Sequence, residues 1–210
     1  MESLKARILN WGNQFGILAF FDSNSYQSRY GNYECIAGIG ALHITSGSLP
    51  DDLQAFHNLH KDWLFGHICY EYKDLLEPKL QSNKPVVHGY PLLQFFVPET
   101  VCYISRNGDT FSIESYNDPN SIYQQILATN ADETHAAMPH IQFTPSIARD
   151  AYLQTIGTLR RHIEEGDCYE INYCIGASAT CRQIDPIHVF RALNKLSPAP
   201  FADRKSTRLN

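Results

Sequence analysis

Cysteine and histidine are the residues of this chain with the most direct metal and redox chemistry, and their spacing decides whether that chemistry is available. No two of the six cysteines form a C-x-x-C pair; they are Cys35, Cys69, Cys102, Cys168, Cys174 and Cys181. A zinc ribbon or a thioredoxin-type site is therefore unsupported. His57 and His60 share a predicted helix, but a metal site would need further ligands around them. We predict buried thiols, an amphipathic helix and no metal site in the chain.

The composition is that of an ordinary globular protein with an acidic balance. Of 210 residues, 43% are hydrophobic, and 22 acidic residues outnumber 17 basic ones to give a net charge of -5. Nucleic-acid surfaces need clustered Lys and Arg, so no nucleic-acid partner is expected. No apolar run is long enough for a membrane span, and Met1–Lys5 does not begin a secretory leader. We therefore expect no membrane association and a cytoplasmic location.

Residues 1–128 are predicted to form a β-rich first region. Apolar runs bounded by turn residues predict strands, and a proline followed by periodic apolar residues predicts a helix. The expected strands lie within Phe15–Phe21, Glu34–Thr45, Trp63–Tyr72 and Val101–Tyr116, with helices at Asp51–Lys61 and Ser121–Leu127. Asn107–Gly108 suits a type I′ hairpin turn inside the last of these strand segments.

The remainder of the chain changes character after a polar linker at 129–143. A helix is expected to open at Thr144–Pro145 and to be stopped by Gly166. Alternating residues predict a two-faced strand over Tyr169–Ala177, with Tyr169, Ile171 and Tyr173 on its buried face. A further helix follows Asp185–Pro186. The predicted fold class is α+β, with antiparallel sheets flanked by helices.

Four segments, in order along the chain, resemble one enzyme family. Ile163–Tyr173 reads I-E-E-G-D-C-Y-E-I-N-Y, and Leu196–Ala202 reads L-S-P-A-P-F-A. Upstream lie W-L-F-G-H-I-C-Y-E at Trp63–Glu71 and F-F-V-P at Phe95–Pro98. Together they resemble the N-terminal part of chorismate-utilising enzymes, closer to aminodeoxychorismate (para-aminobenzoate) synthase component I than to anthranilate synthase component I. Glu170, Tyr173 and Ser197 depart from the usual Gln, Leu and Asn, which indicates a divergent lineage.

The resemblance implies an activity that needs more than these residues. The complete enzyme would convert chorismate and ammonia to 4-amino-4-deoxychorismate for folate synthesis, with Mg²⁺ as cofactor and ammonia from a glutamine amidotransferase partner. Residues 144–202 would be only the start of the chorismate-binding domain, so no catalytic residue, metal ligand or bound cofactor is expected in this chain. Lys195 is predicted to be a solvated helix residue, and Glu170 a polar strand residue.

The resemblance also implies a pocket for tryptophan in the first region. The residues matching that pocket are Ser23, Gln27, Ser28, Arg29, Tyr30, Pro200, Phe201 and Ala202. A zwitterion with an indole ring needs hydroxyl or backbone partners for its charged end and apolar walls for its ring. The alternative is that Asp22–Tyr30 is a plain polar turn. The implied pocket requires this turn to approach Pro200–Phe201 in space.

The last eight residues, Asp203–Asn210, have a different character. They carry three basic residues and do not continue the apolar strand of the family. Because a sequencing-library adapter can encode these residues, we interpret 203–210 as a non-native tail and exclude it from the predicted fold. The alternative is a natural basic tail.

Two alternatives to an aminodeoxychorismate synthase stay open. One is anthranilate synthase component I, and the other is a stand-alone amino-acid-binding regulatory module. The genomic sequence after Ala202 would discriminate them: a continuing frame with acidic metal ligands supports an enzyme, whereas a stop codon supports the module.

Overall fold

A computed structural model of the chain describes residues 1–26, 29, 31–45, 50–77, 79, 91–131, 141–181 and 184–207. The chain divides into two compact units. The first combines Met1–Glu133 with Ile187–Asn210, and the second is Thr134–Pro186. The predicted boundaries at 128, 143 and 202 are sequence-based and stay a prediction. Within the described residues, no helix has both the length and the apolar character that a membrane span requires.

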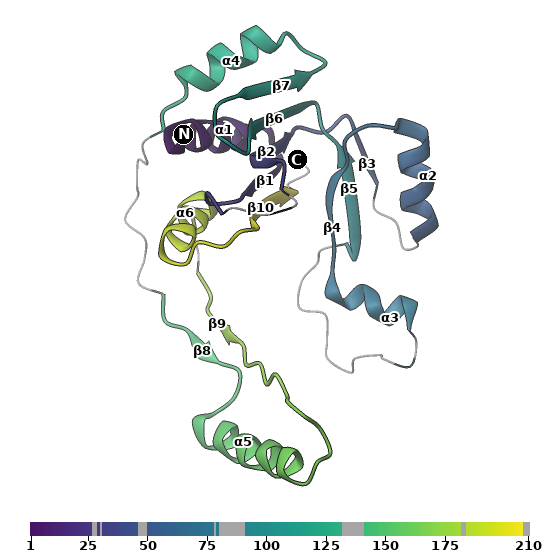
Figure 1. Ribbon diagram of the computed structural model, residues 1–210, viewed down its shortest axis with the longest axis vertical. Coiled ribbons are helices and arrows are strands. Elements are labelled where there is room, and N and C mark those ends of the chain that lie inside the picture. The colour runs from purple at the N-terminus through teal and green to yellow at the C-terminus, as the bar shows by residue number, and fades with distance from the viewer. Residues whose placement is uncertain are drawn as a thin grey trace. The chain divides into compact units, whose positions relative to one another are not determined.

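The centre of the first unit is a five-stranded antiparallel sheet in the order β10-β1-β2-β6-β7 (Figure 1). Its strands are β1 Ile17–Asp22, β2 Tyr33–Ile39, β6 Thr100–Ser105, β7 Phe111–Ser115 and β10 Ala202–Thr207. A smaller antiparallel sheet, in the order β3-β5-β4, contains β3 His43–Thr45, β4 Phe65–Ile68 and β5 Leu93–Val97. Helix α2, Pro50–His60, follows β3, and the short helices η2 (Tyr70–Tyr72) and α3 (Lys73–Leu76) follow β4.

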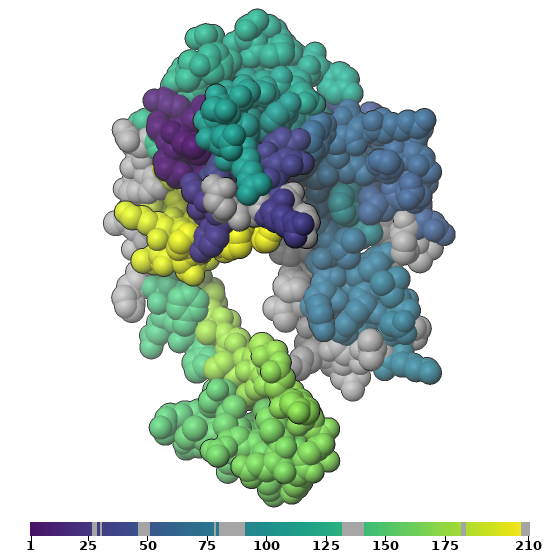
Figure 2. Space-filling model, in the orientation of Figure 1, coloured from purple at the N-terminus to yellow at the C-terminus, as the bar shows by residue number. Residues whose placement is uncertain are grey.

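Both faces of β1 are buried, which explains its continuous apolar sequence. Leu18 and Phe20 face helices α1 (Glu2–Gly12), α4 (Pro119–Ala128) and α6 (Pro186–Leu196). Ile17 and Ala19 face the smaller sheet, where they pack with Phe65 and Phe96 of that sheet and with Val101 of β6. Figure 2 shows the outer surface of this unit, where C-terminal residues in yellow lie directly against N-terminal residues in purple and blue. The large sheet is thus the middle layer between helices and a second sheet.

The close approach of the two sheets depends on a residue without a side chain. A Cβ atom added at Gly38 of β2 would lie 2.5 Å from a ring carbon of Phe65. Phe65 is 5% exposed and packs inside the second core, so its ring has little room to move away. Gly38 therefore allows the aromatic ring of one sheet to lie on the backbone of the other.

Most elements predicted from local pattern are confirmed, including the helices α2, α4 and α6 and the hairpin of β6 and β7. The turn of that hairpin differs from the prediction. A type I′ turn requires a positive φ at both central residues. Gly108 has a φ of 73°, but Asn107 is not among the residues with a positive φ. The loop also spans more than two residues, because Ile104 and Phe111 form the last pair of the ladder. Helix α1, with η1 (Asn13–Phe15) after it, was not predicted.

In the second unit, helix α5 runs over Arg149–Glu164, and Gly166 follows it with a φ of 84°. The expected helix start at Thr144–Pro145 is wrong, since these residues form β8 and pair with β9, Ala177–Ser178. Most of the strand predicted over Tyr169–Ala177 is also absent, and the prediction that Tyr169 and Ile171 are buried is wrong: they are 102% and 42% exposed. An alternating pattern becomes a strand only where a neighbour accepts its hydrogen bonds, and β8 offers just two residues.

The first residues of Asp203–Asn210, which we excluded from the predicted fold, form part of the large sheet. Ala202–Thr207 form β10, which pairs with β1 from Asp22↔Ala202 to Ile17↔Thr207. The edge of β1 is open for pairing, and any extended segment that lacks proline can occupy it.

Candidate functional site

The turn that follows β1 is organised by a buried cluster of three charged side chains. Lys5 of α1 lies between Asp22, at the end of β1, and Glu34, in β2. Its Nζ donates to Asp22 Oδ1 at 2.7 Å and to Glu34 Oε1 at 2.6 Å. All three side chains are no more than 6% exposed. Buried Lys, Asp and Glu occur almost only as partners of one another, so this cluster must form together with the core.

Electrostatics in the cluster favour the ionised forms. Burial alone would lower the pKa of Lys5, but its hydrogen bonds to Asp22 and Glu34 outweigh burial and raise the pKa well above 10.5. Burial likewise opposes ionisation of Glu34, yet hydrogen bonds from Lys5, Ser23 and the Ser25 amide lower the pKa of its carboxyl below 4.5. Lys5 thus stays an ammonium and Glu34 a carboxylate across the neutral pH range.

Glu34 also fixes the backbone of the turn. Its Oε1 accepts the Ser25 amide at 2.9 Å, and its Oε2 accepts the Ser23 hydroxyl at 2.6 Å. Asp22 Oδ1 accepts the Asn24 amide at 2.8 Å. Asn24 and Ser25 have φ values of 51° and 60°, in the left-handed region that residues with a Cβ rarely adopt. The hydrogen bonds to the two carboxylates offset the cost of that conformation.

The turn is also tied to α6 and the loop after it. Asn24 and Asn194 exchange side-chain amide hydrogen bonds, both at 2.8 Å. Asn24 Nδ2 also lies 2.8 Å from the carbonyl oxygen of Ala199. The prediction that the turn approaches Pro200–Phe201 is therefore confirmed for the described residues, across about 170 residues of sequence.

The two segments border one cavity of about 410 Å³, a size that suits a small organic ligand. Its walls combine aromatic rings, a serine hydroxyl, two carboxylates and a guanidinium. The lining residues include Phe21, Asp22, Ser23, Tyr26, Tyr33, Glu34, Arg106 and Phe201. These groups could hold a molecule that carries an apolar ring, an amino group and a carboxylate.

A larger cavity of about 720 Å³ lies between α1, β1 and α6, on the other side of the charged cluster. Lys5 borders this cavity and not the smaller one. Acidic side chains such as Glu2 and basic ones such as Arg191 and Lys195 both line it. The smaller cavity is the one that Ser23, Pro200 and Phe201 line together, so it is the candidate site.

The structure places the predicted pocket residues unevenly. Ser23, Pro200 and Phe201 line the smaller cavity. Arg29 is not among its lining residues, and Ala202 lies in β10 opposite Asp22. Gln27, Ser28 and Tyr30 lie outside the described residues. Binding of tryptophan by these residues stays a prediction.

Several lining residues were missed from sequence, notably Tyr26, Tyr33, Glu34 and Arg106. Glu34 carried a usable signal, because it is an acidic residue that opens an otherwise apolar strand segment. Lys5 carried another, because it shares a helical face with the apolar residues Ile8 and Leu9. An unpaired charge in such a position is costly, so each one indicates a buried partner of opposite charge. Arg106 had no such signal.

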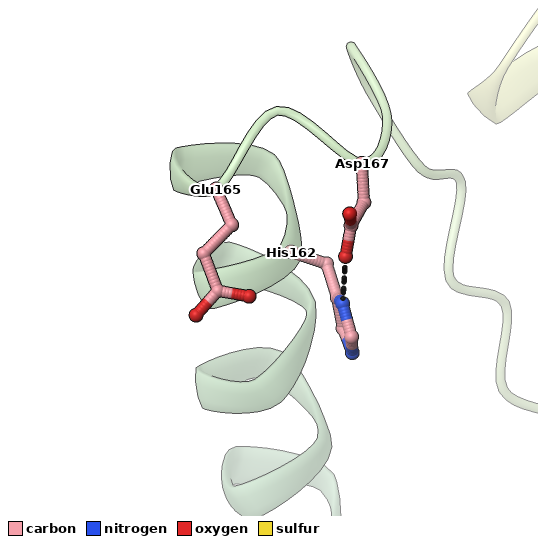
Figure 3. A group of neighbouring side chains, drawn as sticks. All are labelled: His162, Glu165 and Asp167. Atoms are coloured by element: carbon pink, nitrogen blue, oxygen red, sulfur yellow. Dashed lines mark hydrogen bonds and ion pairs between the residues drawn. The ribbon is translucent and has the colours of Figure 1, made fainter.

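Histidines and carboxylates also meet outside this site. In the second unit, His162, Glu165 and Asp167 place one ligand atom each within 4.8 Å of one another, and all three are exposed (Figure 3). His162 Nδ1 lies 2.7 Å from Asp167 Oδ2. Exposed groups of this kind are common without an ion, so we assign no metal site to them. In the first unit, His60 stacks on His43 at 4.2 Å and packs against Phe56.

Known proteins match most of this chain. Residues 20–203 match the family described as chorismate binding enzyme. Over 91 residues the chain is 28% identical to aminodeoxychorismate synthase component 1 of Klebsiella aerogenes, covering 43% of this chain and 20% of that protein. The crystal structure of anthranilate synthase component I from Streptococcus pneumoniae TIGR4 superposes with a TM-score of 0.55 and 17% identity. That likeness covers 82% of this chain and 47% of that one, and it shows the fold alone.

Replacing the buried lysine is the direct test of the charged cluster. Lys5→Met should lower the free energy of unfolding at pH 7 by about 3–5 kcal/mol, because two carboxylates stay buried without their cation. In wild type, the contribution of Glu34 to folding stability is fully present above pH 4.5, the ordinary pKa of a glutamate. It is lost as the pH falls through the lowered pKa of Glu34 in the folded protein. The contribution of Lys5 is complete below pH 10.5 and is lost as pH rises through its raised folded pKa.

In the variant, burial without a cation raises the pKa of the Glu34 carboxyl, so this group takes up a proton more readily and the buried negative charge is removed. The destabilisation should therefore shrink between pH 7 and pH 4, as measured by urea unfolding followed by circular dichroism. Lys195→Met, at an exposed position, is the control and should stay within about 0.5 kcal/mol of wild type. A Lys5→Met variant as stable as wild type at pH 7 would contradict this account.

Proposed function

Because the chain belongs to the chorismate-binding enzyme family, we propose that it is part of an aminodeoxychorismate synthase component I. The likeness to the Klebsiella enzyme of that name is the single observation that favours this member. The complete protein would add ammonia to chorismate and displace its hydroxyl group, giving 4-amino-4-deoxychorismate for folate synthesis. Anthranilate synthase component I is the second candidate, which the likeness to the Streptococcus structure supports at the level of fold.

The cofactor and the partner of the complete enzyme are part of the same proposal. Mg²⁺ would hold the substrate carboxylate through acidic side chains, since carboxylate oxygens are the ligands it prefers. Ammonia would come from a glutamine amidotransferase subunit. The word component in the names of both relatives supports the existence of a partner subunit. We assign neither role to a residue of this chain. The cytoplasmic location belongs to this proposal as well.

We further propose that the cavity at Ser23 binds an amino acid with an aromatic ring, tryptophan in particular. Its support is the combination of an apolar wall with groups for both ends of a zwitterion. Phe21, Tyr33 and Phe201 provide the aromatic wall. The Arg106 guanidinium, from the loop between β6 and β7, suits the ligand carboxylate. The carboxylates at the turn suit the ammonium.

The reaction assignment predicts a division of activity. The 210-residue chain spans 47% of the Streptococcus structure, and we expect it not to aminate chorismate even with ammonium and Mg²⁺ present. The complete protein, with the same additions, should yield 4-amino-4-deoxychorismate, identified by chromatography and mass spectrometry. Anthranilate and pyruvate as products would select the second candidate. Turnover by the 210-residue chain itself would show that the catalytic groups have been assigned to the wrong part of the protein.

The ligand assignment predicts that calorimetry detects tryptophan binding to the 210-residue chain. Arg106→Ala should weaken this binding about tenfold or more, because it removes a charged hydrogen-bond donor to the carboxylate. Arg29→Ala tests the position that the resemblance favours. Arg149→Ala, in the exposed first turn of α5, is the control and should leave the affinity unchanged. Equal affinity for all three variants would exclude a guanidinium contact with the ligand.

A further inference from the structure

The hydrogen bond from Ser23 to Glu34 determines whether the Ser23 hydroxyl can donate or accept a hydrogen bond with a ligand. A serine hydroxyl has a single proton to donate and two lone pairs that accept. Ser23 Oγ donates that proton to Glu34 Oε2 at 2.6 Å. An ionised carboxylate can only accept, so the reverse arrangement is excluded while Glu34 stays charged. The lone pairs of Ser23 Oγ are what remains for the cavity.

Lys5 keeps Glu34 in that state from the other side. Its Nζ lies 2.6 Å from Glu34 Oε1, and the Ser25 amide donates to the same oxygen. Lys5 is 3% exposed, so water does not compete for this contact. It does not border the smaller cavity, and α1 precedes the residues that match the family. Lys5 can therefore influence a ligand there only through the carboxylates.

We infer that Lys5 and Glu34 act as positioning residues, which hold the Ser23 hydroxyl as a hydrogen-bond acceptor and so select a ligand with an amino group at that point. This inference rests on the proposed amino-acid pocket and adds to it which end of the ligand meets the turn. The α-ammonium donates to Ser23 Oγ. The ligand carboxylate, which also only accepts, is excluded from this position and faces Arg106.

Charge in the cavity wall favours the same orientation. Asp22 and Glu34 both line the cavity, and Lys5 supplies one positive charge for their two negative charges. Glu2, whose carboxylate is 3.2 Å from Lys5, adds negative charge from an exposed position. An ammonium placed at Ser23 therefore lies beside the carboxylates of Asp22 and Glu34, which would repel a ligand carboxylate, whereas the Arg106 guanidinium in the same wall suits that carboxylate.

The test compares tryptophan with indole-3-propionate, which has the same ring and carboxylate but lacks the amino group. Calorimetry on the 210-residue chain gives the ratio of the two dissociation constants. Wild type should prefer tryptophan by about 100-fold, because indole-3-propionate leaves the Ser23 acceptor without a donor. Ser23→Ala and Glu34→Gln should each reduce this preference by about tenfold. Ser23→Ala removes the acceptor oxygen. In Glu34→Gln the side-chain amide can donate to Ser23 Oγ, so the Ser23 hydroxyl is free to donate to the ligand instead of accepting from it.

Substitutions at Lys5 and Ser25 distinguish a positioning role from a general loss of structure. Lys5→Arg keeps a cation at the carboxylates and should retain the preference, whereas Lys5→Met should reduce it. Ser25→Ala is the matched control, because Ser25 bonds to the same carboxylate but does not line the cavity, and it should leave the preference unchanged. Thermal unfolding shows which variants are folded. Ser23 is only half-buried, so Ser23→Ala still decides the question if the substitutions at the buried residues prevent folding.

The outcomes distinguish this inference from the proposed function. If wild type binds tryptophan and Ser23→Ala keeps the full preference over indole-3-propionate, the assigned orientation is wrong while the pocket stands. If wild type binds both compounds equally well, the inference is also wrong. If wild type binds neither, the amino-acid pocket itself is wrong, and the role given to Lys5 and Glu34 is overturned with it.

Discussion

The contact between Lys5 and the two carboxylates is the constraint on which the rest of the site depends. It joins three elements, α1, β1 and β2, at a point that water does not reach. An ion pair in such a place adds little net stability compared with apolar packing, but it is costly to break. Its consequence in this protein is specificity: the helix, the two strands and the turn must be in register for the charges to be paired.

From that cluster the geometry of the cavity follows step by step. The carboxylates hold the left-handed turn at Asn24 and Ser25, and the turn in turn holds Asn24 against Asn194. The reciprocal amide pair places the end of α6 beside β1, so that Phe201 lines the cavity together with the turn residues. The five-stranded sheet provides the rigid support, because both of its faces are packed. A pocket whose walls come from distant segments is thus fixed by a small number of polar contacts.

What the sequence could predict follows from the range of the interactions involved. Helices α2, α4 and α6 have apolar residues at helical spacing and begin near Pro50, Pro119 and Pro186, and these signals are local. Lys5 is 17 residues from Asp22 and 29 residues from Glu34, so a prediction from neighbouring residues in the sequence cannot find this pairing. The alternation of apolar and polar residues over Tyr169–Ala177 led to a wrong strand prediction, because a strand also needs a neighbouring strand to pair with. The meeting of Ser23 with Phe201 was predicted only because the chain resembles a family.

The most direct measurement of the central claim is a double-mutant cycle between Lys5 and Glu34. Lys5→Met, Glu34→Gln and the double variant are compared with wild type by urea unfolding at pH 7. If the two side chains depend on one another, the double variant should be more stable than the sum of the single changes predicts, by about 1–3 kcal/mol. Single effects that add to within about 0.5 kcal/mol would show that the two charges are independent, and would contradict the central role of their contact in the site.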